Sequence, residues 1–269
     1  GTDYYGYPLL HKSDGSFQYD PYSYNDYLDT KKSRKRMVYV GANDGMLHAF
    51  DGETGEETFA YIPASSIGYM GNLLFPTSPS FQHRYYVDGP VVVSDAMFGT
   101  TWKTVLVGTS GAGARSAFGL DVTNPASFGP TKVLWEVNDK IDGEVGKRIG
   151  YVLGKPVIVP VRDGAGKPVW KAIFGGGYGN KLNESGTAIG TVTLFVVDMA
   201  TGKVSSIDAK DKTSSAANGL GNIVAIDRYQ YDSASKKFLG SDGMVDTVYG
   251  GDLQGNVWKF GLASESVAY

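Results

Sequence analysis

A strand–turn–strand unit recurs along most of this chain and constrains its fold more than any other feature. The four copies span residues 37–51, 104–122, 172–198 and 247–260. Their equivalent apolar positions are Tyr39, Leu106, Phe174 and Tyr249. The copies therefore repeat about every 70 residues, and a period of this length with several strands in each unit is the signature of a β-propeller.

Apolar stretches between these hairpins supply the other strands that a propeller blade needs. They are residues 90–98, 132–137, 155–161, 203–207 and 222–227. We expect about four blades of four antiparallel strands and almost no helix. The first blade lacks an opening strand unless residues 1–30 provide one, and the fourth lacks a closing strand. Either the two ends complete one blade together, or the chain is an arc of a larger ring.

Composition agrees with an all-β fold and excludes several classes of site. The 37 glycines and 18 tyrosines suit strands joined by tight turns. The absence of cysteine excludes disulfides and thiolate metal sites. A net charge of −3 implies no broad attraction to nucleic acid. No apolar run approaches the roughly 20 residues that a membrane-spanning helix needs.

The sequence predicts two regions. Residues 1–36 read as an irregular lead-in, and residues 37–269 as propeller blades. The chain begins at Gly1 without Met or a signal peptide, which suggests a processed or excised piece. The basic run at residues 31–36 is most simply a solvated approach to the first strand. A binding patch for an acidic partner is the alternative.

Two turns share the pattern D-x-x-T-G, at residues 51–55 and 198–202. An Asp that accepts hydrogen bonds from the following backbone, followed by a Gly that tolerates positive φ, closes a tight turn between strands. With Ala49 and Phe59, the first turn resembles the blade-docking motif of quinoprotein-type propellers. We interpret both turns as structural.

Other motifs have simple structural explanations. His11, His48 and His83 do not have paired metal-ligand spacing, so packing or surface hydrogen bonding explains them. The glycine-rich segments 110–115 and 175–180 lack the features of a phosphate-binding loop and are expected to be turns. No nucleophile elbow is present. Arg162-Asp-Gly164 reads as a hairpin turn.

The repeats resemble the PilC/PilY family of type IV pilus tip-associated adhesin and biogenesis proteins. The matching stretches, in family order, are residues 38–50, 83–90, 102–108, 120–125, 218–220 and 248–260. Three places depart from the family pattern: Gly119, Gly261 and the segment 175–180. None of these departures alters the expected fold.

The resemblance implies the first four or so blades of a modified seven-bladed propeller, in the C-terminal half of a secreted protein. It implies that the protein promotes pilus assembly against retraction and contributes to adhesion and surface sensing. Minor pilins at the pilus tip and host or abiotic surfaces are the implied partners. The implied location is the cell surface of a Gram-negative bacterium, reached through the periplasm.

The resemblance also implies a calcium loop, D-x-[DN]-x-D-G-x-x-D, ahead of the strand at residues 247–252. With Asp246 at its last position, Asp242 takes the fifth position and the Met244 carbonyl the seventh. The first and third positions become Phe238 and Gly240, which bring no side-chain oxygen. Ca²⁺ prefers six to eight oxygen ligands, so the loop is weakened.

An insertion explains the missing ligands. Residues 228–241 split the loop, so Asp227 returns as the first ligand if the insertion loops out, and Asp232 is a weaker candidate. The alternative is that Asp242-Gly243 is a plain hairpin turn.

The sequence therefore favours a non-enzymatic propeller scaffold, since propeller strands hold loops that bind partners. A quinoprotein-like dehydrogenase would need pyrroloquinoline quinone, calcium and an Asp base in a central channel. A carbohydrate-binding propeller is a third possibility.

Overall fold

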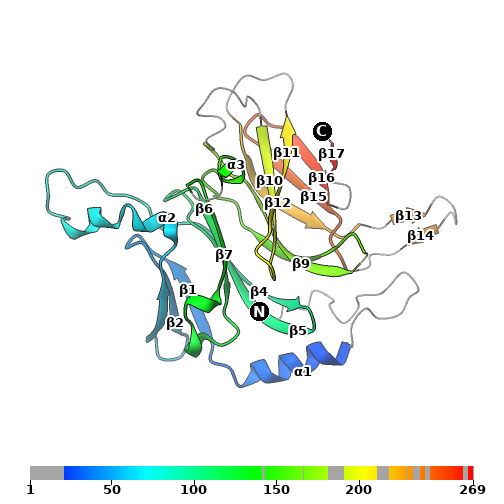
Figure 1. Cartoon of the computed structure of the whole chain (residues 1–269), viewed down its shortest axis with the longest axis horizontal. Helices are drawn as coiled ribbons and strands as arrows, with labels where there is room; N and C mark the ends of the chain where they lie inside the picture. Colours follow the sequence, from blue (N-terminus) through cyan, green and yellow to red (C-terminus); the bar gives the residue numbers. More distant parts are fainter. Residues whose placement is uncertain are drawn as a thin grey trace.

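A computed structural model shows an arc of antiparallel sheets that follow one another along the chain (Figure 1). It describes residues 21–140, 143–165, 167–180, 191–210, 218–228, 230–232, 237–239, 243–262 and 266–268. Four of its five sheets are propeller blades, so the expected all-β propeller is confirmed, and the fifth sheet is a two-stranded hairpin.

In each blade the strands pair in chain order, and in blade 4 the hairpin of β13 and β14 lies between the first two strands. Blade 1 is β1 (Met37–Gly41), β2 (Leu47–Asp51) and β3 (Glu57–Tyr61). Blade 2 is β4 (Val91–Phe98), β5 (Thr101–Thr109), β6 (Ser116–Asp121) and β7 (Val133–Asn138). Blade 3 is β8 (Val157–Arg162), β9 (Pro168–Gly175), β10 (Thr191–Asp198) and β11 (Val204–Lys210). Blade 4 is β12 (Leu220–Ile226), β15 (Thr247–Asp252), β16 (Val257–Gly261) and β17 (Ser266–Ala268).

The core lies between the faces of neighbouring blades, because each strand turns alternate side chains to opposite faces. Leu106 packs with the cluster between blades 1 and 2, whereas its neighbours Val105 and Val107 pack with the cluster between blades 2 and 3. Ile173 packs between blades 3 and 4. Every interior blade face is therefore covered by the next blade.

Strand pairing corrects the alignment of the repeats by one residue. The strands β2, β6, β10 and β16 are equivalent, and each pairs with the strand before it in its blade. The residues that pair with their last residues are Met37, Val105, Lys171 and Thr247. Counting from them, Tyr39 corresponds to Val107 and Ile173, rather than to Leu106 and Phe174. The sequences of blades 1 and 2 share V-x-V-G, but aligning this motif shifts the strands by one residue. A shift of one residue places each side chain on the opposite face of the sheet, toward the other neighbouring blade.

The two ends of the arc differ from the expectation. Blade 4 does have a closing strand, the short β17, which pairs with β16. Blade 1 has three described strands, as expected if residues 1–30 add none. β17 completes blade 4 rather than blade 1, so the described chain ends do not complete one blade together.

Residues 21–32 form a helix, α1 (Pro21–Lys32), so the prediction of an irregular lead-in over residues 1–36 is wrong for this part. The segment carries helix signals: Pro21 at the first position and two lysines at the C-terminal end. Tyr24, Tyr27 and Leu28 fall on one face at helical spacing and pack on the core between blades 2 and 3. Residues 1–20 lie outside the described part.

Short elements decorate the connections. They are α2 (Ala64–Ile67), η2 (Met70–Leu74), η3 (Pro125–Ser127), η4 (Pro130–Lys132), α3 (Gly143–Gly146) and the paired strands β13 (Gln230–Asp232) and β14 (Lys237–Leu239). The segment holding α2 and η2 projects from blade 1, and β13–β14 projects from blade 4 (Figure 1). The hairpin confirms that the insertion between β12 and β15 loops out.

Candidate functional site

The turn between β12 and β15 carries the residues expected to bind calcium. In blade 3 the same connection is the short turn from Arg162 to Pro168, whereas in blade 4 it includes the β13–β14 hairpin. Asp227 directly follows β12, and Gly243 lies beyond the hairpin. The Gly243 N–H donates to Asp227 Oδ2 at 2.7 Å, with Gly243 at a φ of 80°. Because positive φ favours glycine, Gly243 marks the turn as expected.

The two other candidate calcium ligands that the structure describes, Met244 and Asp246, have different surroundings. Met244 is buried in the core cluster between blades 2 and 3, with 2% of its surface exposed. Asp246 Oδ1 accepts the Thr247 hydroxyl at 2.6 Å and lies 3.5 Å from the Arg228 Nε. Its backbone holds β12 in place, since the Asp246 N–H donates to the Ile226 carbonyl. Asp242 lies outside the described residues.

These contacts test whether a calcium ion fits. Asp227 and Asp246 are two carboxylates, fewer ligands than Ca²⁺ requires. The Arg228 guanidinium beside Asp246 also opposes a second cation there. In the described ranges, no group of three or more His, Asp or Glu side chains could hold a metal ion. The described residues alone therefore do not form a calcium site.

Asp227 and Gly243 also line a cavity of about 430 Å³. Its other walls come from the inner strands of three blades, including Ser94 of β4 and Ile158 of β8. The turn thus faces the side of the arc where the inner strands converge.

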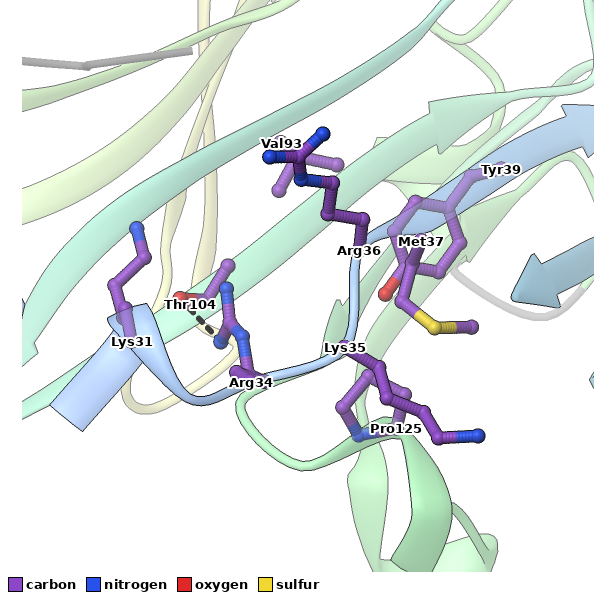
Figure 2. Close-up of a pocket in the computed structure, with 9 residues that line it drawn as sticks. All are labelled: Lys31, Arg34, Lys35, Arg36, Met37, Tyr39, Val93, Thr104 and Pro125. Atoms are coloured by element: carbon purple, nitrogen blue, oxygen red, sulfur yellow. Dashed lines mark hydrogen bonds between the residues drawn. The ribbon is translucent and has the colours of Figure 1, made fainter. Parts of the chain in front are cut away.

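A second cavity, of about 570 Å³, lies where the basic run enters blade 1 (Figure 2). Its lining residues are Lys31, Arg34, Lys35, Arg36, Met37, Tyr39, Val93, Thr104 and Pro125. Four cations therefore lie along a wall that the apolar side chains of β1 and β4 complete. The basic run is thus more than a solvated approach to the first strand.

Hydrogen bonds to blade 2 hold the basic run in place. Lys31 pairs with Asp95 at 2.6 Å, and Asp95 also accepts the hydroxyls of Tyr24 and Thr104 at 3.0 and 2.7 Å. Arg34 donates to Thr104 Oγ1 at 2.9 Å (Figure 2). It also donates to the Thr123 carbonyl at 3.1 Å. Asp95 is 1% exposed, so its charge must be compensated within the fold.

The Lys35 side chain points away from those of Arg34 and Arg36 (Figure 2) and pairs with Asp51 at 2.7 Å. This hydrogen bond, with those from the Glu53 and Thr54 amides, lowers the pKa of Asp51 to about 2. Arg36 is exposed, and no ion pair joins it to a carboxylate in the part of the chain that the structure describes.

The D-x-x-T-G turns adopt the expected geometry. Asp51 Oδ1 accepts the Glu53 and Thr54 amides, and Asp198 Oδ1 accepts those of Ala200 and Thr201. The closing glycines, Gly55 and Gly202, have φ values of 75° and 70°. Lys171 pairs with Asp198 at 2.7 Å, as Lys35 does with Asp51. Both turns are structural.

The remaining motifs follow their structural interpretations. His48 contacts Asp44 and Glu57, each at 2.9 Å, and His83 packs edge-on against Tyr85. Residues 110–115 form the turn between β5 and β6. Arg162-Asp-Gly164 begins a hairpin turn in which the Asp163 N–H donates to the Lys167 carbonyl at 2.8 Å. His11 lies outside the described residues.

None of the helices in the described part of the chain has the length and apolar composition that a membrane span requires.

Comparison with known proteins places the chain among pilus proteins. A family model described as the PilY1 beta-propeller domain matches residues 16–268. A type IV pilus biogenesis factor PilY1 homolog of Xylella fastidiosa is 41% identical over 254 residues, covering 90% of this chain and 15% of the relative. The type IV pilus biogenesis factor PilY1 of Pseudomonas aeruginosa is 37% identical over 246 residues, covering 91% of this chain and 18% of the relative.

A solved structure of a PilY1 protein is also similar to this chain. The crystal structure of the Pseudomonas aeruginosa PilY1 C-terminal domain matches with a TM-score of 0.65 and 36% identity, covering 89% of this chain and 41% of that one. The chain therefore spans less than a fifth of these two curated relatives and less than half of the solved domain.

Proposed function

This chain belongs to the PilY1 β-propeller family, and from that premise we propose that it is a non-enzymatic binding scaffold in type IV pilus biogenesis. The observation that carries the proposal is the family match over residues 16–268, joined to a blade architecture whose strands hold projecting loops. The relatives are named as type IV pilus biogenesis factors. In a propeller the loops, rather than the strands, determine what is bound.

The projecting segment between β3 and β4 supports a binding role. Ile67, Leu74, Phe75 and Tyr85 expose 63%, 73%, 68% and 52% of their surfaces. Exposed apolar side chains gathered on one projection are typical of interaction surfaces. We propose minor pilins at the pilus tip as partners, with adhesion to host or abiotic surfaces and opposition to retraction as the outcome. The corresponding location is the bacterial cell surface, after export through the periplasm.

A chimera tests this proposal. The matching propeller region of the Pseudomonas aeruginosa relative is replaced by this chain, and surface pili, twitching and attachment are measured. We expect pili to be restored. The matched variant carries Leu74→Glu and Phe75→Glu, which alter the exposed projection and leave the blade core intact. We expect it to keep its fold and to lose attachment. An exported, folded chimera without pili would contradict the proposal.

The non-enzymatic part has its own test. Pyrroloquinoline quinone and calcium are supplied together with an alcohol and a redox dye. We expect no dye reduction above that of the cofactor alone. Alcohol-dependent reduction that is lost when an Asp lining the inner cavity is replaced would support the dehydrogenase alternative.

We also propose that the turn between Asp227 and Asp246 binds calcium weakly and makes the scaffold calcium-responsive. The supporting observations are the convergence of Asp227 with Gly243 and the place of Asp242 and the Met244 carbonyl in the family loop. With few ligands, the dissociation constant is expected on the order of 10⁻⁴ M, as in extracellular modules.

Isothermal titration calorimetry tests this part with a control from the same place in blade 3. Asp246→Ala should abolish saturable calcium binding, and Asp163→Ala should leave it unchanged, because Asp163 occupies the corresponding turn and accepts only backbone amides in the described contacts. Melting in calcium and in chelator gives a second readout. No heat and no melting shift at millimolar calcium would mean that the segment is a plain turn.

A further inference from the structure

The segment that connects blades 1 and 2 carries a polar cleft of about 250 Å³, on the projection that holds α2 and η2 (Figure 1). The side chains that line it are those of Tyr69, Asn72, Ser80, Gln82 and Arg84, and Gly68 and Gly71 complete the wall. The described walls therefore come from one continuous stretch, residues 68–84, between two blades that are both present. None of these wall residues is acidic.

Hydrogen bonds hold the cleft in shape. The Asn72 side-chain amide donates to the Gln82 carbonyl at 2.8 Å, which ties the outgoing arm of the segment to the returning arm. The hydroxyl of Tyr86, a buried residue, donates to the Tyr69 carbonyl at 3.0 Å. A site whose groups are in place before a ligand arrives loses less conformational entropy on binding.

Two cations converge on the Tyr69 ring. The Arg84 guanidinium lies 4.1 Å from the ring centroid and the Lys140 ammonium 4.6 Å from it. Lys140 follows β7 of blade 2, and a Cβ on Gly68 would lie 3.6 Å from its ammonium, so this charge reaches the rim of the cleft. Neither cation pairs with a carboxylate among the residues that the structure describes. A bound anion would relieve their mutual repulsion.

The other groups of the cleft suit hydroxyls. The Asn72 and Gln82 amides and the Ser80 hydroxyl offer both donors and acceptors, which a ligand hydroxyl can satisfy in either direction. A bare phosphate or sulfate offers acceptors and would leave the amide oxygens without a donor. The guanidinium of Arg84 has the planar fork that matches a carboxylate. The cleft is smaller than the roughly 300–1,000 Å³ of pockets for drug-sized ligands, so it suits a single ring.

We infer that this cleft binds a carboxylate-bearing sugar unit of a surface glycan. Arg84 binds the carboxylate, Lys140 adds attraction from the rim, and the Asn72 and Gln82 amides bind ring hydroxyls. A sialic acid that ends a glycan chain and a uronic acid within a polysaccharide share this chemistry. The inference rests on the binding role proposed above for the projecting segment and names the class of its ligand.

Saturation-transfer NMR with free sugars tests the inference on the chimera described above. The probes are the methyl glycosides of a sialic acid and of galacturonic acid, the methyl ester of each, and inorganic phosphate. We expect saturable binding of at least one acid and much weaker binding of its ester and of phosphate. The acid that binds more tightly identifies the source of the ligand.

Three of these results would overturn the inference. Equal binding of acid and ester would show that the charge is not recognised. Phosphate that binds as tightly as the acid would show that the sugar is not recognised. A folded chimera that binds neither acid would show that the cleft is not a site for acidic sugars.

Charge variants locate the site. Arg84→Gln should weaken binding about tenfold, because it removes a charged hydrogen bond. Lys140→Gln should weaken it about threefold, since the ammonium acts from the rim. Arg36→Gln is the matched control, because it removes the same charge from another exposed position and should leave the affinity unchanged. An equal loss in the control would overturn the inference, since general attraction would then explain binding. Circular dichroism checks that each variant is folded.

The Tyr69 ring offers a further comparison. Tyr69→Phe keeps the ring beside both cations and should keep the affinity, whereas Tyr69→Leu removes the ring and should weaken binding about threefold. Equal effects of the two variants would contradict the role of the ring as support for the cations. Restored pili without sugar binding would refute this inference alone. Sugar binding without restored pili would refute the pilus role alone.

Discussion

Blades 1 and 2 are built from the same strand–turn–strand unit, yet equivalent positions in them differ widely in exposure. Val38 of blade 1 is 54% exposed, whereas Leu106, its counterpart in blade 2, is fully buried. The counterparts in blades 3 and 4, Ala172 and Val248, are buried too. Leu106, Ala172 and Val248 face the preceding blade. Val38 lies on the same side of blade 1, where the described chain has no blade. Burial at this position is therefore conferred by the neighbouring sheet rather than by the strand that carries the residue.

Blade 4, at the other end of the arc, also has apolar side chains on an uncovered face. Val224 and Val257 of blade 4 expose 61% and 66% of their surfaces on the face turned away from blade 3. Such apolar faces favour association with a further sheet or with other molecules. Each of the two terminal blades of the described chain therefore has one apolar face that no other described blade covers.

Core truncation should give the largest contrast between equivalent positions. Leu106→Ala removes a fully buried side chain and should lower the free energy of unfolding by about 2–5 kcal/mol. Val38→Ala, at the exposed counterpart, should change it by less than about 0.5 kcal/mol. Denaturant titration of both variants measures the difference. Equal losses would show that blade 1 has a covered outer face in solution.

Charge truncation should give the next largest effect. Asp95→Ala removes the buried acceptor of Lys31 and of the Tyr24 hydroxyl, both on α1, and of the Thr104 hydroxyl within blade 2, and should cost about 3 kcal/mol. Lys35→Ala removes the exposed lysine that pairs with the buried Asp51 and should have a smaller effect, because the Glu53 and Thr54 amides still donate to Asp51. The same titration measures both. If Asp95→Ala leaves the free energy of unfolding unchanged, the contacts of α1 with Asp95 contribute no stability.

Acid should weaken the closing turns. The hydrogen bond from Lys35 and those from the Glu53 and Thr54 amides lower the pKa of Asp51 to about 2. A depressed pKa contributes stability that is present above the unfolded value of about 3.9 and is lost as pH falls through the folded value. Wild type should therefore lose stability between about pH 4 and pH 2. Asp51→Asn should show a shallower loss, measured by denaturation at each pH.

His48 should give the smallest effect, in the opposite pH direction. Burial lowers its pKa, but hydrogen bonds to Glu57 and Asp44 outweigh burial and raise it above the usual value. The stability that it contributes is present below about pH 6.5 and is lost as pH rises through the folded pKa. NMR titration of the imidazole measures the shift, and His48→Gln removes the pH dependence. A pKa below the usual value would contradict this assignment.

The fold was largely predictable because its signals are local. Alternating apolar residues specify strands, and the D-x-x-T-G turns needed only an Asp acceptor and a Gly with positive φ. The helix α1 was missed, although Pro21, the terminal lysines and the spacing of Tyr24, Tyr27 and Leu28 mark it. An irregular lead-in is expected over residues 1–36 because this segment shows no strand period.

The candidate sites were less predictable. The spacing of Asp242, Met244 and Asp246 identified the turn, and the convergence of Asp227 with Gly243 followed from the looped-out hairpin. The proximity of Arg228 to Asp246 could not be foreseen, because it depends on how the insertion leaves β12. The basic run was visible in the sequence, but the cavity beside it was not.

The sequence by itself determined the strands of the repeated hairpins, their order and the turns that join them, since these depend on residues close together in the chain. Tertiary structure decided which face of each strand is buried, because the pleat and the neighbouring blade set that outcome. It also decided that Arg36, rather than Lys31 or Lys35, lacks a described carboxylate partner, since Asp95 and Asp51 reach the other two cations from distant strands. Contacts between residues far apart in sequence cannot be deduced from local patterns, because they exist only after the blades have packed.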